Sequence, residues 1–238
     1  MKIIKFEEPK ITIVEDFLSQ EECDYFLRVK DYSEELWGLD FQLNYPKEHE
    51  THEDLWPSIL QWDGMCVNIT RKDFYSRYDL DGDILDSLAS RIKDIVADTF
   101  NPNIKIEQYL INRWRLGRGQ APHLDYFDST EEGHDYEMLA MNNLPKAYLD
   151  TFEEKFQTKH YSSLVYLNED YLGGELYFPQ YPDIMIKPKP GTLILFSGNE
   201  NTLHGVKEVD QGIRYTISIF WTDLAKVKGP NQNKSVMI

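Results

Sequence analysis

Residues 192–221 read TLILFSGNENTLHGVKEVDQGIRYTISIFW and contain two β-type runs separated by glycine, asparagine and aspartate. Short runs of this kind, with turn residues between them, predict β-strands rather than helices. The same pattern extends outward from this stretch over most of the chain after Ile104. We therefore expect strands at 104–115, 162–167, 174–178, 184–186, 192–196 and 214–221, with weaker strands around His123 and His204.

These strands favour a mainly β fold of the α+β class, a double-stranded β-helix of the jelly-roll or cupin-like type. Helices and one short strand at 11–14 are expected before them. Ser19 and Glu22 fit a capping box, which predicts a helix from there to about Val29. A second helix is expected to be capped by Asp83, with apolar residues at helical spacing: Leu85, Leu88, Ile92, Ile95 and Val96. Both helices should pack against one sheet.

The 238 residues, 41% of them hydrophobic, can bury one substantial core, so we expect a single domain over 1–238. Residues 1–103 would support a β-helix core at 104–222, and 223–238 would form a tail. An insertion at 127–160 interrupts the core and is too long for an ordinary hairpin loop. Its AYLDTFEEKF segment predicts a helix, either a lid over the barrel or a helix packed on the sheet. The stretch 32–80 cannot be placed.

The formal net charge is −16 and the pI is about 4.7. A surface this acidic repels a phosphate backbone, so nucleic acid is disfavoured as a partner. No apolar run is long enough for a membrane span, and the first residues lack the features of a signal peptide, so we expect a cytoplasmic location. The two cysteines, Cys23 and Cys66, show no metal-ligand spacing. The oligomeric state stays open.

His123-Leu124-Asp125, followed at a distance by His204, carries the main chemical signal. On a strand, residues i and i+2 point to the same face, so His123 and Asp125 can both face a barrel interior. With His204 they would form one triangular face around a metal ion. Two histidines and one carboxylate are the ligand set of non-haem iron(II), with open positions for substrates.

Arg214 lies in the β-type run GIRYTISIFW, ten residues after His204. An arginine that points inward from such a strand needs an anionic partner, because a buried guanidinium without one is costly. Its planar fork suits a carboxylate. A dicarboxylic cosubstrate would supply that partner.

Four stretches now make a family resemblance visible: RWRLGRGQAPHLDYF, SSLVYLNEDYLGGELYFP, PKPGTLILFSGNENTLHGVKEV and GIRYTISIFW. Together they resemble the prolyl 4-hydroxylase-like branch of the iron(II)- and 2-oxoglutarate-dependent dioxygenases, over about 104–222. The amino-terminal ITIVEDFLSQEECDYF resembles it more loosely. The long insertion after Asp125 departs from the family pattern, as does an arginine where collagen-type prolyl hydroxylases carry lysine.

The resemblance implies that His123, Asp125 and His204 bind iron(II). It implies that Arg214 and Tyr166 hold the distal carboxylate of 2-oxoglutarate. Trp114 falls near a position where many relatives have a tyrosine beside the cosubstrate. Dioxygen is the implied co-reactant and ascorbate the reductant. The implied reaction is C–H hydroxylation, first of all of a prolyl residue in a peptide or protein, with release of succinate and CO2.

Three alternatives remain open. A free amino acid or another small molecule can be the substrate on the same scaffold. A cupin-like protein could hold a metal or anion without turnover, although Arg214 and Tyr166 argue against it. Nucleic-acid demethylases of the superfamily usually carry a second arginine where this chain has Phe220. The other histidines are not expected to bind the metal: His49, His52, His134 and His160.

Overall fold

The computed structural model describes residues 1–31, 58–62, 65–69, 82–100, 103–125 and 159–225. An eight-stranded sheet, in the order β1-β2-β11-β7-β14-β5-β3-β4, is its largest element. Neighbouring strands are antiparallel, except for the parallel pair β3 and β5. The strands are β1 (Lys2–Phe6), β2 (Ile11–Glu15), β3 (Ser58–Trp62), β4 (Met65–Ile69), β5 (Ile104–Trp114), β7 (Tyr161–Tyr166), β11 (Leu193–Ser197) and β14 (Arg214–Asp223).

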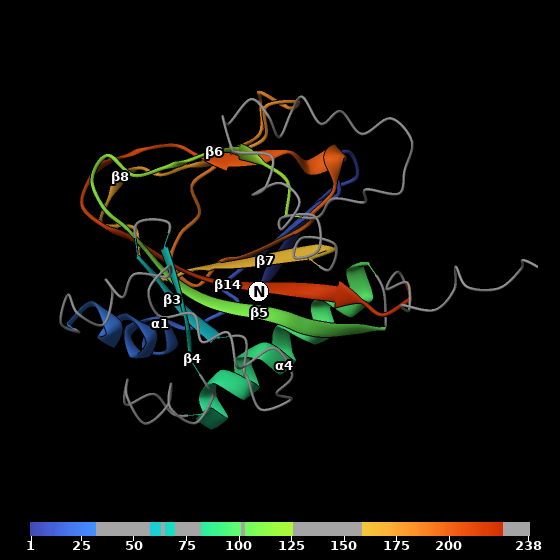
Figure 1. Cartoon of the computed structure of the whole chain (residues 1–238), viewed down its shortest axis with the longest axis horizontal. Coiled ribbons are helices and arrows are strands. Elements are labelled where there is room, and N and C mark those ends of the chain that lie inside the picture. The colour runs from blue at the N-terminus through green and yellow to red at the C-terminus, as the bar shows by residue number, and fades with distance from the viewer. Residues whose placement is uncertain (32–57, 63–64, 70–81, 101–102, 126–158, 226–238) are drawn as a thin grey trace, which may run out of the picture.

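A second, four-stranded sheet in the order β10-β9-β12-β6 lies over one face of the large sheet (Figure 1). Apolar side chains from both sheets, including Phe196 of β11 and Leu176 of β9, form one buried cluster between them. A separate two-stranded sheet pairs β8 with β13. The short elements are β6 (Gln120–His123), β8 (Leu172–Gly173), β9 (Leu176–Tyr177), β10 (Met185–Ile186), a 3-10 helix η2 (Glu200–Thr202), β12 (His204–Val206) and β13 (Val209–Gln211).

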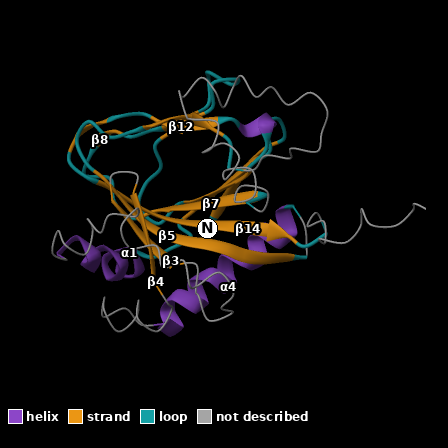
Figure 2. Ribbon diagram, viewed as in Figure 1, coloured by secondary structure: helices purple, strands orange, loops and turns teal. Residues whose placement is uncertain are grey.

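Helices α1 (Gln20–Leu27) and α4 (Gly82–Thr99) lie on the opposite face of the large sheet (Figure 2). A 3-10 helix, η1 (Arg28–Asp31), continues α1. The capping box forms as the sequence predicts, because Glu22 N donates to Ser19 Oγ at 3.2 Å and Ser19 N donates to Glu22 Oε2 at 2.8 Å. Phe26 and Ile92 join the apolar cluster beneath the sheet, so burial of these faces fixes the helices in place.

The two faces of the large sheet differ in chemistry, and β14 shows the difference most clearly. Its residues Tyr215, Ile217 and Ile219 join the cluster with the helices. The alternate residues Thr216 and Ser218 point to the other face and are buried as well. The space between the two sheets is therefore lined partly by polar side chains.

The predicted mainly β character is confirmed, and both expected helices form, although α4 begins at Gly82 and Asp83 lies within its first turn. The expected strand at 174–178 is shorter, because β9 covers only Leu176–Tyr177. Strands β1, β3, β4, β8 and β13 were not predicted. The insertion's expected helix lies outside the described residues.

Within the described part of the chain, no helix is long and apolar enough to cross a membrane.

Candidate metal and cosubstrate site

Two neighbouring strands of the smaller sheet bring the three candidate metal ligands together. His123 is the last residue of β6, Asp125 follows two positions later, and His204 is the first residue of β12. The register of the antiparallel pair places His204 directly opposite His123. Strand pairing thus closes the long interval in sequence between the two histidines.

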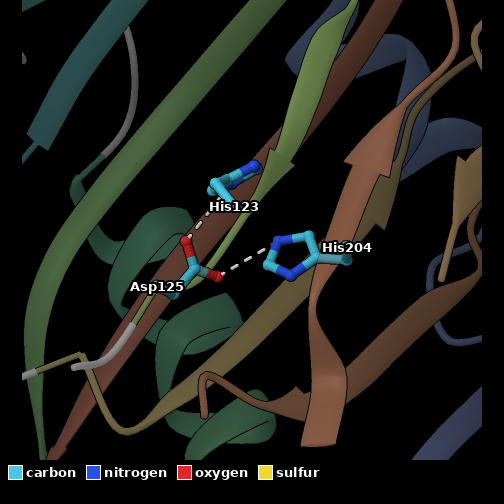
Figure 3. Close-up of side chains that lie close together, drawn as sticks. All are labelled: His123, Asp125 and His204. Carbon is cyan, nitrogen blue, oxygen red and sulfur yellow. Dashed lines mark ion pairs between the residues drawn. The ribbon is translucent and has the colours of Figure 1, made fainter. Parts of the chain in front are cut away.

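The side chains of His123, Asp125 and His204 point toward one another (Figure 3). Asp125 Oδ1 lies 3.7 Å from His123 Nε2, and Asp125 Oδ2 lies 3.4 Å from His204 Nε2. One donor atom from each residue lies within 4.8 Å of the others. Two imidazoles and a carboxylate in this arrangement fit one transition-metal ion and leave part of its coordination sphere open.

Neighbouring groups orient two of these ligands. His204 Nδ1 lies 2.9 Å from the carbonyl oxygen of Thr202, so it carries the proton and leaves the Nε2 lone pair for a metal. Ser162 Oγ donates to Asp125 Oδ2 at 2.5 Å. Because Ser162 belongs to β7, this hydrogen bond joins the large sheet to the candidate metal site.

Burial sets the protonation of the site. The side chains of His204 and Asp125 are 6% and 8% exposed, whereas that of His123 is 25% exposed, so His123 is the most exposed of the three candidate ligands. Burial lowers the pKa of His204 to about 4, although the Asp125 carboxylate opposes this shift. Burial alone would raise the pKa of Asp125, but the two histidines and the Ser162 hydroxyl hold it below its usual range. His204 and Asp125 are therefore in the protonation states that bind a metal at neutral pH.

Arg214 lies on the same face of the large sheet as Ser162. The residue is 1% exposed, and its guanidinium carbon lies 4.8 Å from the ring centroid of Tyr166 and 5.8 Å from that of Trp114. Arg214 Nη2 donates to Tyr166 Oη at 3.0 Å. The register of β14 with β5 places Trp114 directly opposite Arg214. The three predicted cosubstrate residues are thus neighbours.

Several buried polar atoms around Arg214 have no hydrogen-bond partner among the described residues: Arg214 Nε, Trp114 Nε1 and Tyr171 Oη. Burial raises the pKa of Tyr171 to about 12, against the opposing effect of Arg214, so its hydroxyl keeps its proton. In the described part of the chain, no carboxylate forms an ion pair with Arg214. Buried donors without partners are rare in folded proteins, and this group fits an anionic oxygen ligand.

Gly174 leaves room beside this group. Its φ is +68°, and a Cβ atom there would lie 3.0 Å from Arg214 Cδ and 3.1 Å from Tyr171 Cε2. A larger residue would therefore displace the guanidinium or the phenol ring. Tyr171 was not predicted as a site residue, because nothing in the local sequence YLNEDYLGG indicates that its ring packs next to Arg214.

The candidate metal ligands and the buried Arg214 each contact a residue on the same face of β7. Asp125 contacts Ser162, and Arg214 contacts Tyr166. Ser162 and Tyr166 are four residues apart, so their Cα atoms lie roughly 13 Å from each other along the strand. The candidate metal ligands and the buried guanidinium therefore line the same space between the two sheets.

His160 is buried but has a structural contact. Its Nδ1 accepts a hydrogen bond from the backbone N–H of Asp223 at 3.1 Å, at the end of β14. It is not part of the three-residue group that could hold a metal. His49, His52 and His134 lie outside the described residues.

Removing the carboxylate tests the metal site directly. We expect Asp125→Ala to weaken the binding of a divalent transition metal at least about hundredfold, because one of three ligands is lost. Isothermal titration with Mn(II) measures the change. Asp183→Ala, which removes an exposed carboxylate away from the site, is the matched control and should bind like the unaltered protein. Equal metal affinity for both variants would contradict the assignment of Asp125.

The low pKa of His204 predicts a pH dependence of stability. The imidazole has a pKa of about 4 in the folded protein and 6.5 when exposed, so between these values the unfolded chain binds more protons. We expect the metal-free protein to lose stability as the pH falls through this window, at up to about 1.4 kcal/mol per pH unit from this group. Urea unfolding at several pH values measures it. His204→Gln should show a shallower dependence, and an unchanged slope would refute the assignment.

Comparison with known proteins agrees with this geometry. Residues 109–222 match the sequence pattern of the 2OG-Fe(II) oxygenase superfamily, which is named for 2-oxoglutarate and iron(II). The chain is 38% identical over 68 residues to prolyl 3-hydroxylase 2 of Rattus norvegicus, across 27% of this chain and 10% of that protein. It is 23% identical over 232 residues to the probable prolyl 4-hydroxylase 7 of Arabidopsis thaliana, across 87% of this chain and 61% of that protein. The alignment thus spans about a tenth of the length of the first curated relatives.

Among solved structures, the fold is similar to that of a viral collagen prolyl hydroxylase from Paramecium bursaria Chlorella virus 1, determined as a 2OG complex. The TM-score is 0.53 at 18% sequence identity, with 90% of this chain and 96% of that chain covered. The part of the chain that carries the sequence pattern of the 2OG-Fe(II) oxygenase superfamily, residues 109–222, is the part that contains His123, Asp125, His204 and Arg214.

Proposed function

We propose that this protein is an iron(II)- and 2-oxoglutarate-dependent dioxygenase that hydroxylates a C–H bond. One observation carries the proposal: a group of two histidines and a carboxylate shares an interior with a buried arginine that has no carboxylate partner among the described residues. A metal-binding protein without turnover needs the first feature but not the second. The two together match a reaction that uses a metal and a dicarboxylic cosubstrate.

In this proposal His123, Asp125 and His204 hold iron(II), and Arg214 pairs with the distal carboxylate of 2-oxoglutarate. The hydroxyl groups of Tyr166 and Tyr171 donate hydrogen bonds to the same carboxylate, and Trp114 Nε1 is a further hydrogen-bond donor. When bound, iron(II) supplies the activation of dioxygen, with 2-oxoglutarate as the source of electrons. The chain's own residues bind and orient the reactants and exclude water from a buried interior.

The hydrogen bond from Ser162 has a specific part in this arrangement. It directs Asp125 Oδ2 while Oδ1 remains available, and it works against protonation of the carboxylate. The Thr202 carbonyl orients His204 by keeping the proton on Nδ1, which leaves the Nε2 lone pair for the metal. These contacts hold two ligands in their binding orientation before a metal arrives, which favours affinity.

A prolyl residue in a peptide or protein is the substrate class that we propose. The relatives support it, since they are named as a prolyl 3-hydroxylase and a probable prolyl 4-hydroxylase. The position on the ring stays open, because these relatives are named for hydroxylation at different carbons. The exposed side of His123 gives the direction from which a substrate can approach. We further propose that the facing sheets are the halves of a double-stranded β-helix within a single oxygenase domain. A cytoplasmic location and ascorbate as reductant stay predictions.

The test measures the formation of succinate and of the hydroxylated substrate in the same reaction. The protein is incubated with iron(II), 2-oxoglutarate and oxygen, together with proline-containing peptides or free amino acids. We expect succinate and a substrate heavier by one oxygen atom, detected by mass spectrometry. The His123→Ala variant should form neither. Equal succinate from both proteins, or none from the unaltered protein with any substrate, would contradict the proposed function.

Arg214 is expected to govern the cosubstrate requirement separately from the metal. Loss of a charge-assisted contact costs about 1.5–3 kcal/mol, so Arg214→Ala should raise the 2-oxoglutarate concentration for half-maximal rate roughly 10- to 150-fold. Arg214→Lys should lie between, because lysine keeps the charge but loses the planar fork. Titration with Mn(II) should show little change in metal affinity. An unaltered 2-oxoglutarate requirement would reject Arg214 as the anchor.

A further inference from the structure

Three polar residues lie together on the interior face of the large sheet, between the candidate metal ligands and Arg214. They are Asn112 on β5 and Thr216 and Ser218 on β14. All three residues are buried, with exposed fractions of 4%, 1% and 4%. Asn112 lies opposite Thr216 in the strand register, and its neighbour in sequence, Ile111, joins the cluster on the helix side. Asn112 therefore points into the space between the sheets.

Asn112 donates two hydrogen bonds, while its Oδ1 has no hydrogen-bond partner in the described part of the chain. Its Nδ2 donates to Ser218 Oγ at 2.6 Å and to Thr216 Oγ1 at 3.3 Å. A hydroxyl that accepts through its oxygen still has one proton to donate. Neither hydroxyl donates to an acceptor among the described residues. The amide therefore leaves both hydroxyl protons free to turn away from Asn112.

The strand register places the hydroxyls of Thr216 and Ser218 beside the part of β7 that runs from Ser162 to Tyr166. Ser218 lies opposite Leu164, and Thr216 lies opposite Tyr166. Along β7 these positions follow Ser162, which contacts Asp125, and reach Tyr166, which contacts Arg214. A cosubstrate held by Arg214 at one end and directed to the metal at the other passes this part of β7.

We propose that Asn112 is a positioning residue for the cosubstrate, acting through Thr216 and Ser218. By donating to both hydroxyl oxygens, it turns their protons toward the oxygens of bound 2-oxoglutarate. An anionic cosubstrate offers only acceptors, so a wall of aligned donors matches it. The inference rests on the proposed function and adds to it a source of affinity for the 2-oxo acid that is separate from Arg214.

Binding of 2-oxoglutarate to the Mn(II)-loaded protein, measured by calorimetry without oxygen turnover, tests this inference. Asn112→Leu removes the amide at similar size and should weaken binding about tenfold. Asn112→Asp keeps the shape but accepts from both hydroxyls and adds a negative charge, so it should weaken binding at least as much. Ser218→Ala should also weaken binding. The affinity for Mn(II) should stay within about twofold in each variant.

Coupling between the residues separates positioning from a general structural role. If Asn112 acts through Ser218, the double variant should bind 2-oxoglutarate no more weakly than the worse single variant. Ser163→Ala is the matched control, because this serine is also buried but bonds to Trp221 Nε1 and the Ile219 carbonyl on the helix side. That control should keep the affinity of the unaltered protein.

Several results would overturn the inference. Unchanged affinity in Asn112→Leu would do so, as would unchanged affinity in Asn112→Asp, since the hydroxyl protons would then already face Asn112. Strictly additive losses would show that the two residues act separately. If Asn112→Leu does not fold, Ser218→Ala and Thr216→Val decide, and unchanged affinity in both rejects the inference. If the unaltered protein does not bind 2-oxoglutarate, both the proposed function and this inference are refuted.

Discussion

The buried positive charge of Arg214 is the constraint on which the interior of this protein depends. A guanidinium that is 1% exposed carries a large desolvation cost, and the described residues offer it no carboxylate. Contacts with the faces of Tyr166 and Trp114 and one hydrogen bond offset part of that cost. An anionic partner would offset the rest of the desolvation cost of Arg214. Under the proposed function, the distal carboxylate of 2-oxoglutarate would supply that anion.

Strand alternation lets one sheet meet this demand without losing its core. Residues Tyr215, Ile217 and Ile219 of β14 pack against the helices, while Arg214, Thr216 and Ser218 point to the other sheet. The apolar face supplies the burial that stabilises the sheet. The polar face can then satisfy ligands, because its strands are already held in place from behind. The helices thus contribute to the site without touching it.

The sequence allowed the local parts of this arrangement to be predicted. The closeness of His123 and Asp125 was predicted from the two-residue period of a strand, although β6 ends at His123 and Asp125 lies two residues beyond it. An inward Arg214 was predicted from an arginine in a β-type run. Asn112 and Tyr171 could not be found in this way. The environment of Asn112 depends on the register between β5 and β14, and that of Tyr171 on packing beside Gly174. Both are long-range features with no local periodicity. Strands β3 and β4 were missed because their segment shows mixed polar and aromatic residues without a clear pattern.

The two halves of the site differ in how firmly the fold supports them. Arg214 and Tyr166 belong to long or central strands of the large sheet, whereas β6 and β12 are only four and three residues long. Short strands contribute few ladder hydrogen bonds, so the smaller sheet relies on the apolar cluster between the sheets. The Ser162 hydrogen bond is a polar link between the large sheet and the candidate metal ligands. A metal bound by His123, Asp125 and His204 would join β6 to β12 and strengthen the weaker layer. Metal binding and the stability of that layer are therefore coupled.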